Sequence, residues 1–147
     1  MKILPILLGG IIAGLIIVAG EAVLNLMVLA DEWTQLFARL ALPQPTAAVA
    51  AQGLLKLMLM GVFSVWLGAT FKPVFAYPHR AGIIAGLVVW FLVWAWVQWG
   101  MLLAGYVTAP IAAWTVAWGV VELPLAAWAG TCVHARLAAR SGAIRSI

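Results

Sequence analysis

The sequence predicts an all-α polytopic membrane protein: a four-transmembrane-helix bundle with a short external interfacial helix. Of its 147 residues, 67% are hydrophobic and only 8% are charged, whereas a soluble surface needs roughly a quarter of charged residues. Four apolar stretches also exceed the roughly 20 residues that cross about 30 Å of hydrocarbon as a helix. They cover residues 3–29, 47–70, 81–107 and 111–133. We therefore expect a single membrane domain over residues 1–147.

The first apolar stretch follows a cation, Lys2, and resembles a secretory signal with cleavage after Ala30. The run is longer than the apolar core of a usual signal. We therefore expect it to be a retained first transmembrane helix.

The external loop after the first stretch, "DEWTQLFARLALPQP", contains a helical pattern of its own. One apolar stripe at i, i+3, i+4 and i+7 consists of Trp33, Leu36, Phe37 and Leu40. This pattern predicts a helix over about 31–42, lying in the outer interface with Trp33 at headgroup depth. Pro43 and Pro45 should end it, and Thr46 can cap the next helix.

The distribution of cations predicts the orientation. If the N-terminus is cytoplasmic, six of the eight cations lie inside: Lys2, Lys72, Arg80, Arg136, Arg140 and Arg145. Arg39 alone lies outside, and Lys56 lies within a helix. The positive-inside rule then predicts cytoplasmic N- and C-termini, in a bacterial inner membrane. Residues 134–147 should form a basic cytoplasmic tail that is attracted to anionic lipid headgroups.

An eight-residue string occurs twice, as "GIIAGLII" over 10–17 and "GIIAGLVV" over 82–89. In each copy two glycines four residues apart remove side chains from one helix face: Gly10 and Gly14, then Gly82 and Gly86. Such spacing allows helices to pack closely in a membrane. The repeat also suggests two helical hairpins of the same orientation, as an alternative to chance similarity.

Each long stretch contains one strongly polar residue, and these are Glu21, Lys56, Gln98 and Glu122. At 1.5 Å per residue, they lie roughly 12 to 16 Å from the outer ends of their helices. They should therefore form one intramembrane polar layer. A second ring of polar groups accompanies it, formed by Asn25, Gln52 and Thr115.

Helical phase places Glu21, Lys56 and Glu122 on inward faces, whereas Gln98 lies far around its helix and could face a partner. An unpaired charge at such depth costs about 2.5–3.5 kcal/mol on insertion scales. We therefore predict an ion pair between Lys56 and one glutamate. The surplus carboxylate must hold a proton, a metal cation or an amine ligand. Alternatively, the ion pair only fixes which helices pack together.

Tryptophans crowd the third and fourth stretches, and four of them could form an aromatic ligand wall: Trp90, Trp94, Trp96 and Trp118. Such a wall would suit a lipid, quinone or pigment. Bulky packing against lipid or a neighbouring subunit is the alternative interpretation.

Other chemistry is sparse. A single cysteine, Cys132, excludes an internal disulfide. The two histidines, His79 and His134, both fall at the cytoplasmic edge, so we expect no metal site. No nucleophile–base set, nucleotide loop or cation-rich nucleic-acid surface is visible. We expect no enzymatic activity, no nucleic-acid partner and no required cofactor.

Two segments, "AGIIAGLVVWFLVW" over 81–94 and "WGVVELPLAAWAG" over 118–130, resemble an uncharacterised group of small bacterial four-helix integral membrane proteins. The resemblance implies the fold but no activity. Small size and short loops favour an accessory or structural subunit of a larger membrane complex, or a homo-oligomer. A small proton- or cation-coupled transporter or channel is the alternative. A transporter should have a water-accessible path to Glu21 and Glu122, and a scaffold should have a dry, closed pair.

Overall fold

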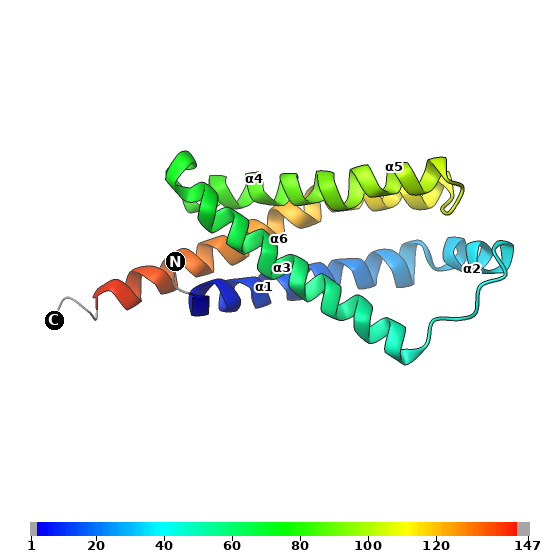
Figure 1. Cartoon of the computed structure of the whole chain (residues 1–147), viewed down its shortest axis with the longest axis horizontal. Helices are drawn as coiled ribbons and strands as arrows, with labels where there is room; N and C mark the ends of the chain where they lie inside the picture. The colour runs from blue at the N-terminus through cyan, green and yellow to red at the C-terminus, as the bar shows by residue number, and fades with distance from the viewer. Residues whose placement is uncertain (1–2, 144–147) are drawn as a thin grey trace.

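The computed structural model describes residues 3–143, and its regular structure there is entirely helical (Figure 1). The elements are α1 (Ile3–Val23), η1 (Leu24–Val28), α2 (Ala30–Arg39), α3 (Ala47–Phe75), α4 (Pro78–Trp90), η2 (Phe91–Ala95), α5 (Trp96–Leu103) and α6 (Ala109–Ala143). Within residues 3–143, four helical spans are long and apolar enough to cross a membrane: Ile3–Val28, Ala47–Phe75, Pro78–Leu103 and Ala109–Arg140. The predicted fold class, a four-helix membrane bundle, is confirmed.

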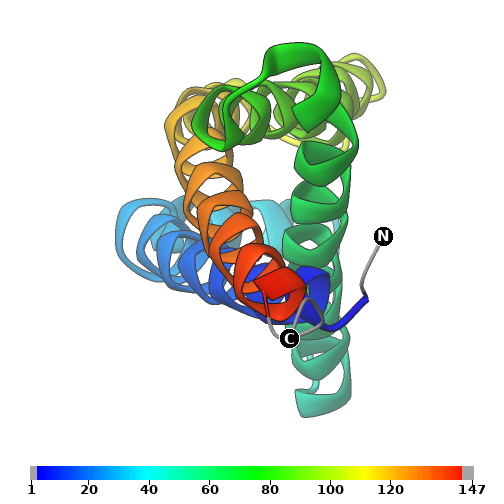
Figure 2. The same cartoon turned by 90° about the vertical axis from the view of Figure 1, so that its left-hand side faces the viewer.

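The four spans enclose a core of small and branched side chains. Seen end on, α1 and α4 lie on opposite sides, with α3 and α6 between them (Figure 2). Ala13, Ile17, Val65 and Leu123 are fully buried at the centre. Their small or compact side chains allow the helices to approach closely, which is how membrane helices gain packing energy without a hydrophobic driving force.

The glycines of both repeats lie at helix contacts. A Cβ on Gly10 would meet Val62 of α3, and one on Gly14 would meet Met58. The second repeat faces α6 instead, where a Cβ on Gly82 would lie 2.8 Å from the Cα of Trp128. One on Gly86 would lie 2.5 Å from the carbonyl oxygen of Leu123. The two copies therefore serve different helix pairs.

Helix α2 covers the end of the bundle opposite Ile3, which we call the outer end (Figure 1). A second group of buried apolar side chains joins it there to η1 and α6: Leu24, Leu29, Leu36, Val107 and Ile111. Arg39 donates to the carbonyl oxygen of Gly105 at 3.1 Å, which ties the end of α2 to the loop before α6. This helix ends at Arg39, three residues earlier than the sequence predicted. One face of α2 packs on the bundle, and its other face is exposed.

The outer part of α3 diverges from the other helices (Figure 1). Thr46 caps it as predicted, since its hydroxyl accepts from the amide of Val49 at 3.3 Å. Every residue over 47–56 is exposed, including Gln52 and Lys56. The second half of α3 is packed tightly by contrast, because Gly61 lies against the backbone of Gly14.

Two short π-helical turns interrupt the outer halves of the first and third spans: η1 over Leu24–Val28 and η2 over Phe91–Ala95. A π-helical turn inserts an extra residue and rotates the helix beyond it. The sequence analysis did not predict either turn. Such turns occur frequently at functional sites.

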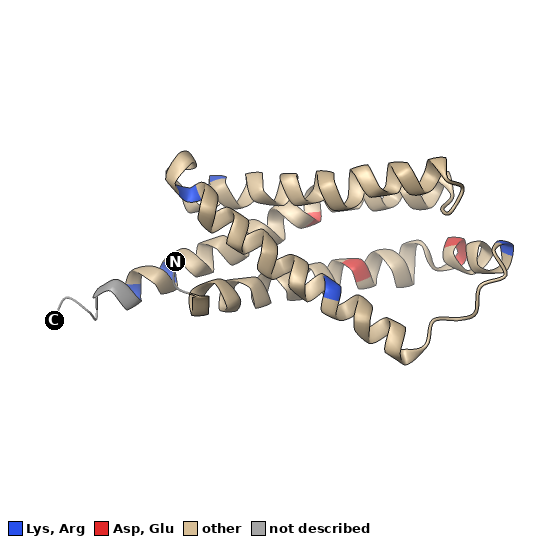
Figure 3. Cartoon of the chain, in the orientation of Figure 1, with Lys and Arg blue, Asp and Glu red and all other residues tan. Residues whose placement is uncertain are grey.

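Charges separate along the bundle (Figure 3). One end carries Lys72, Arg80, Arg136 and Arg140, while Asp31, Glu32 and Arg39 lie on α2 at the opposite end. Lys2 and Arg145, also used in the orientation argument, lie outside the described residues. The predicted tail over 134–147 is corrected in part, because α6 continues as a helix to Ala143.

Candidate functional site

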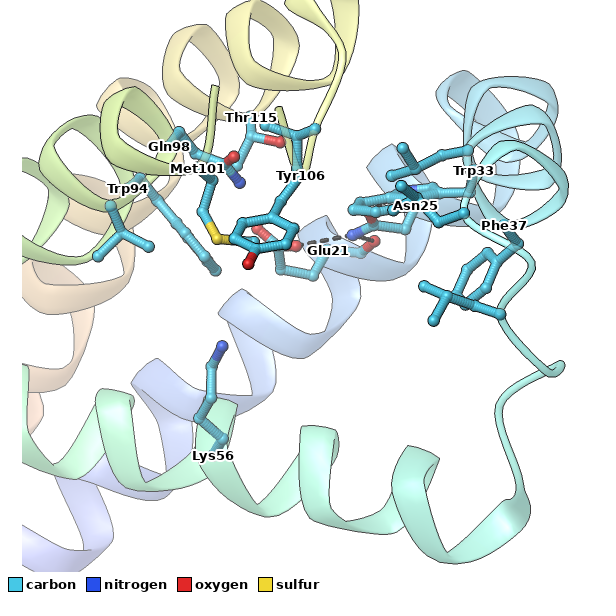
Figure 4. Close-up of a pocket in the computed structure, with 15 residues that line it drawn as sticks. Glu21, Asn25, Trp33, Phe37, Lys56, Trp94, Gln98, Met101, Tyr106 and Thr115 are labelled. Atoms are coloured by element: carbon cyan, nitrogen blue, oxygen red, sulfur yellow. Dashed lines mark hydrogen bonds between the residues drawn. The ribbon is translucent and has the colours of Figure 1, made fainter. Parts of the chain in front are cut away.

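A cavity of about 450 Å³ lies between the outer part of α3 and the outer halves of the other helices (Figure 4). Its wall is mainly apolar and aromatic, with Trp33, Phe37, Trp94 and Tyr106 around it. The polar groups that reach it are Glu21, Asn25, Lys56, Gln98 and Thr115. The cavity thus gathers every member of the predicted polar layer except Glu122, together with two members of the second ring.

Glu21 ends a chain of hydrogen bonds that starts on α2. The indole N–H of Trp33 donates to Asn25 Oδ1 at 2.8 Å, and Asn25 Nδ2 donates to Glu21 Oε2 at 2.7 Å. Asn25 lies in η1, so the π-helical turn sets its direction. The other carboxylate oxygen, Glu21 Oε1, is buried without a hydrogen-bond partner. Trp33 therefore points toward the bundle, which the sequence analysis did not predict, while its headgroup depth stays a prediction.

Glu122 lies beside Glu21, close enough for the two carboxyl groups to interact electrostatically. Glu122 Oε1 accepts from the indole N–H of Trp118 at 3.4 Å. It rests directly on Gly20, where a Cβ would overlap it. Glu122 Oε2 is buried without a partner. We call Glu21 and Glu122 the carboxyl pair; both are more than nine-tenths buried.

Lys56 does not form the predicted ion pair with either glutamate of the described chain. Its Nζ points into the cavity and lies 5.3 Å from the centre of the Trp94 ring (Figure 4). It acts on Glu21 only by longer-range attraction. Lys56 lies in the part of α3 that diverges from the other helices (Figure 1). Its ammonium group therefore stays on the α3 side of the cavity.

Gln98 lies with the other members of the polar layer at this cavity. The sequence analysis left open that it could face a partner, but its side chain is buried and lines the same cavity as Glu21. The π-helical turn η2 lies between Gly86 and Gln98, and its extra residue changes the phase that a regular helix would give. Gln98 Oε1 has no hydrogen-bond partner. Thr115, on α6, is also buried at this cavity, whereas Gln52 points away into the surroundings.

The four tryptophans do not share one face, so they do not form the predicted ligand wall. Trp90 donates to the carbonyl oxygen of Val116 at 2.9 Å, and Trp94 lies buried at the cavity. Trp96 is 58% exposed and packs edge-on against Trp99. Trp118 serves Glu122 from α6.

A second groove of about 350 Å³ reaches the carboxyl pair from another side. It runs between α1 and α6, and its lining is apolar except for Glu122: Ile16, Gly20, Ala117, Trp118, Val121 and Leu125. Glu21 lines the first cavity and Glu122 lines this groove. The carboxyl pair therefore lies between two separate openings.

Within residues 3–143 no group of three or more His, Cys, Asp or Glu side chains could hold a metal ion. Comparisons with family models, curated proteins and solved structures give no match for this chain. The resemblance to small bacterial membrane proteins consequently stays a prediction. The function of the site is therefore inferred from the chemistry of its own residues.

Sequence reasoning missed Gly20, the inward position of Trp33 and both π-helical turns. Gly20 had a usable signal, because it precedes Glu21 and a small residue beside a membrane carboxylate leaves room for a partner. The π-helical turns had no such signal, since neither contains a glycine or a proline.

The hydrogen bond between Trp33 and Asn25 can be tested by removing its donor. We expect Trp33→Phe to loosen α2 by about 1 kcal/mol, the usual net contribution of one hydrogen bond. Trypsin should then cut the purified protein faster after Arg39, at the end of α2. Trp99→Phe is the matched control, because Trp99 is 57% exposed and belongs to another helix. Equal cleavage rates for the two variants would contradict this role for Trp33.

Proposed function

We propose that this chain is a small proton- or cation-coupled transporter, with the carboxyl pair as the site that exchanges its cation. The observation that carries the proposal is the pair itself: two buried carboxyl groups lie side by side, and no ammonium group of residues 3–143 is bound to either. Glu21 also lines a cavity large enough for a small molecule. A scaffold role favours a dry, closed ion pair, and the open cavity argues for access.

The charge of the pair supports the proposal energetically. A single unpaired charge in the membrane costs several kcal/mol, and two carboxylates in contact repel one another as well. A proton or another cation on the pair removes most of both costs. The pair therefore has a reason to bind a cation and, once one is bound, to exchange it for another.

The side of the membrane to which the cavity opens follows from a proposed orientation. The cation-rich end of the bundle, with Lys72, Arg80, Arg136 and Arg140, is cytoplasmic under the positive-inside rule. The cavity then opens near the outer face of a bacterial inner membrane. In this arrangement α2 lies on the external side and covers part of the entrance.

Proteoliposomes test the proposal directly. Vesicles with an acidic interior and a pH-sensitive dye would receive external Na⁺, K⁺ or an organic ammonium salt, and proton efflux would be recorded. We expect Glu21→Gln and Glu122→Gln each to reduce the flux about tenfold or more, because each removes an ionisable half of the exchange site. Asp31→Asn is the matched control, since Asp31 is an exposed acid on α2. Equal flux in all variants, or none above empty vesicles, would overturn the proposal.

A subunit role is the second candidate, and the exposed outer part of α3 favours it. All residues over 47–56 are exposed in the described chain, and a neighbouring helix of another subunit or of a second copy could cover them. Extraction from native membranes in mild detergent followed by mass analysis tests this candidate. Other membrane subunits in fixed ratio would favour it, and the chain alone or as a homo-oligomer would favour the transporter.

A further inference from the structure

We infer that the cavity beside Glu21 is the binding site of a protonated organic amine with an apolar body. The inference rests on the proposed transport function and names its substrate class. Three features of the cavity carry it: unpartnered acceptor atoms, an aromatic wall, and a lysine that already occupies part of the wall.

Two acceptor atoms and one donor atom of the residues that line this cavity are buried without a hydrogen-bond partner: Glu21 Oε1, Gln98 Oε1 and Trp94 Nε1. Glu21 is 8% exposed and Gln98 is 9% exposed, and both side chains line the cavity (Figure 4). Leaving acceptors buried and unpaired is unfavourable, and more so for a charged group. The N–H groups of an ammonium ion in the cavity would supply donors to Glu21 and Gln98 once these side chains turn toward it, and its charge would neutralise Glu21.

The rest of the wall suits an apolar and aromatic body. Trp33, Phe37, Trp94 and Tyr106 contribute rings, and aliphatic side chains fill the gaps between them. Aromatic faces attract cations, and the attraction grows as water is excluded. Lys56 demonstrates the geometry, since its ammonium group lies 5.3 Å from the centre of the Trp94 ring. A volume of about 450 Å³ accommodates an amine with one aromatic ring.

Inorganic cations fit this wall poorly. Ca²⁺ and Mg²⁺ require six or more oxygen ligands, and channels replace the hydration shell of K⁺ with rings of carbonyl oxygens. The cavity offers scattered side-chain oxygens on a mostly apolar surface instead. Its chemistry therefore selects a cation that carries its own apolar surface.

Lys56 should compete with the ligand. Its Nζ occupies the Trp94 face and projects from the exposed part of α3, so a bound amine would have to displace it or remain beside a like charge. Lys56→Gln removes that repulsion and keeps a side chain of similar length. We expect this variant to bind the amine several-fold more tightly.

Equilibrium dialysis of the purified full chain in detergent micelles tests the inference, with phenethylammonium as the probe. The neutral analogue 2-phenylethanol carries the same apolar body, and K⁺ carries the charge alone. We expect saturable binding of phenethylammonium only, about tenfold weaker binding in Glu21→Gln and tighter binding in Lys56→Gln. Trp99→Phe is the control for a tryptophan change away from the cavity.

Two results would overturn the inference. One is equal binding of phenethylammonium and 2-phenylethanol after subtraction of empty micelles. The other is unchanged phenethylammonium binding in both Glu21→Gln and Lys56→Gln. The vesicle assay distinguishes failure of the amine site from failure of the transport function. Glutamate-dependent proton flux driven by K⁺ or Na⁺, without amine binding, would leave transport standing with another substrate. Absence of glutamate-dependent flux with every cation, phenethylammonium included, would remove both.

Discussion

Replacing Gly61 by alanine should destabilise the bundle by about 3 kcal/mol, at the upper end of the usual cost of overpacking a core. Gly61 lies at the closest approach of α3 and α1, where a Cβ would overlap the backbone nitrogen of Gly14 and lie 2.7 Å from the carbonyl oxygen of Gly10. Backbone atoms cannot rotate away, so the two helices must separate. The packing between them would then loosen along the whole line where α1 and α3 meet.

The same helix provides its own control. Gly53 lies eight residues earlier in α3, and a Cβ there would meet nothing within 4 Å. Gly53→Ala should leave stability unchanged or raise it by up to about 1 kcal/mol, because alanine favours a helix over glycine. Unfolding midpoints of both variants in mixed detergent micelles would measure the difference. A Gly61→Ala midpoint equal to that of Gly53→Ala would show that this helix contact is not tight.

The fold was predictable because a membrane reduces the choices that a sequence can express. Every backbone polar group must be paired within the bilayer, so apolar stretches of this length become spanning helices. The start of α3 was equally local, because Thr46 caps the helix and Pro43 and Pro45 precede it. The glycines were identified as packing residues because only backbone approach explains their spacing, although which helix each pair meets depended on the tertiary arrangement.

The site was predicted in its residues but not in its connections. Depth along a helix is a sum of equal steps, so counting residues predicted a common level for Glu21, Gln98 and Glu122, and in the structure Glu21 and Gln98 line one cavity. Direction around the helix is not such a sum when a π-helical turn intervenes, which is why helical phase alone left the direction of Gln98 open. The predicted ion pair of Lys56 was wrong for another reason. The position of its ammonium group depends on the divergence of α3, a tertiary feature without a local signal.

Gly20→Ala should abolish most of the transport while leaving the fold intact. The added Cβ would overlap Glu122 Oε1, which is the far end of a flexible side chain, so the carboxyl group can rotate away without moving the helices. Rotation would break its bond from Trp118 and its contact with Glu21. Hydrogen bonds to charged groups contribute about 1.5–3 kcal/mol, which corresponds to a loss of about tenfold or more in flux.

The proteoliposome flux assay and the unfolding midpoint, measured on the same preparation, check this prediction. Gly100→Ala is the control, because Gly100 has no neighbour within 4 Å of an added Cβ. If Gly20 acts only through Glu122, the double variant Gly20→Ala, Glu122→Gln should transport no worse than Glu122→Gln alone, since coupled sites are not additive. Parental flux in Gly20→Ala would mean that contact between the two carboxyl groups is not required for exchange. A large fall in its unfolding midpoint would mean that Glu122 cannot yield, and Gly20 would then be a packing residue like Gly61.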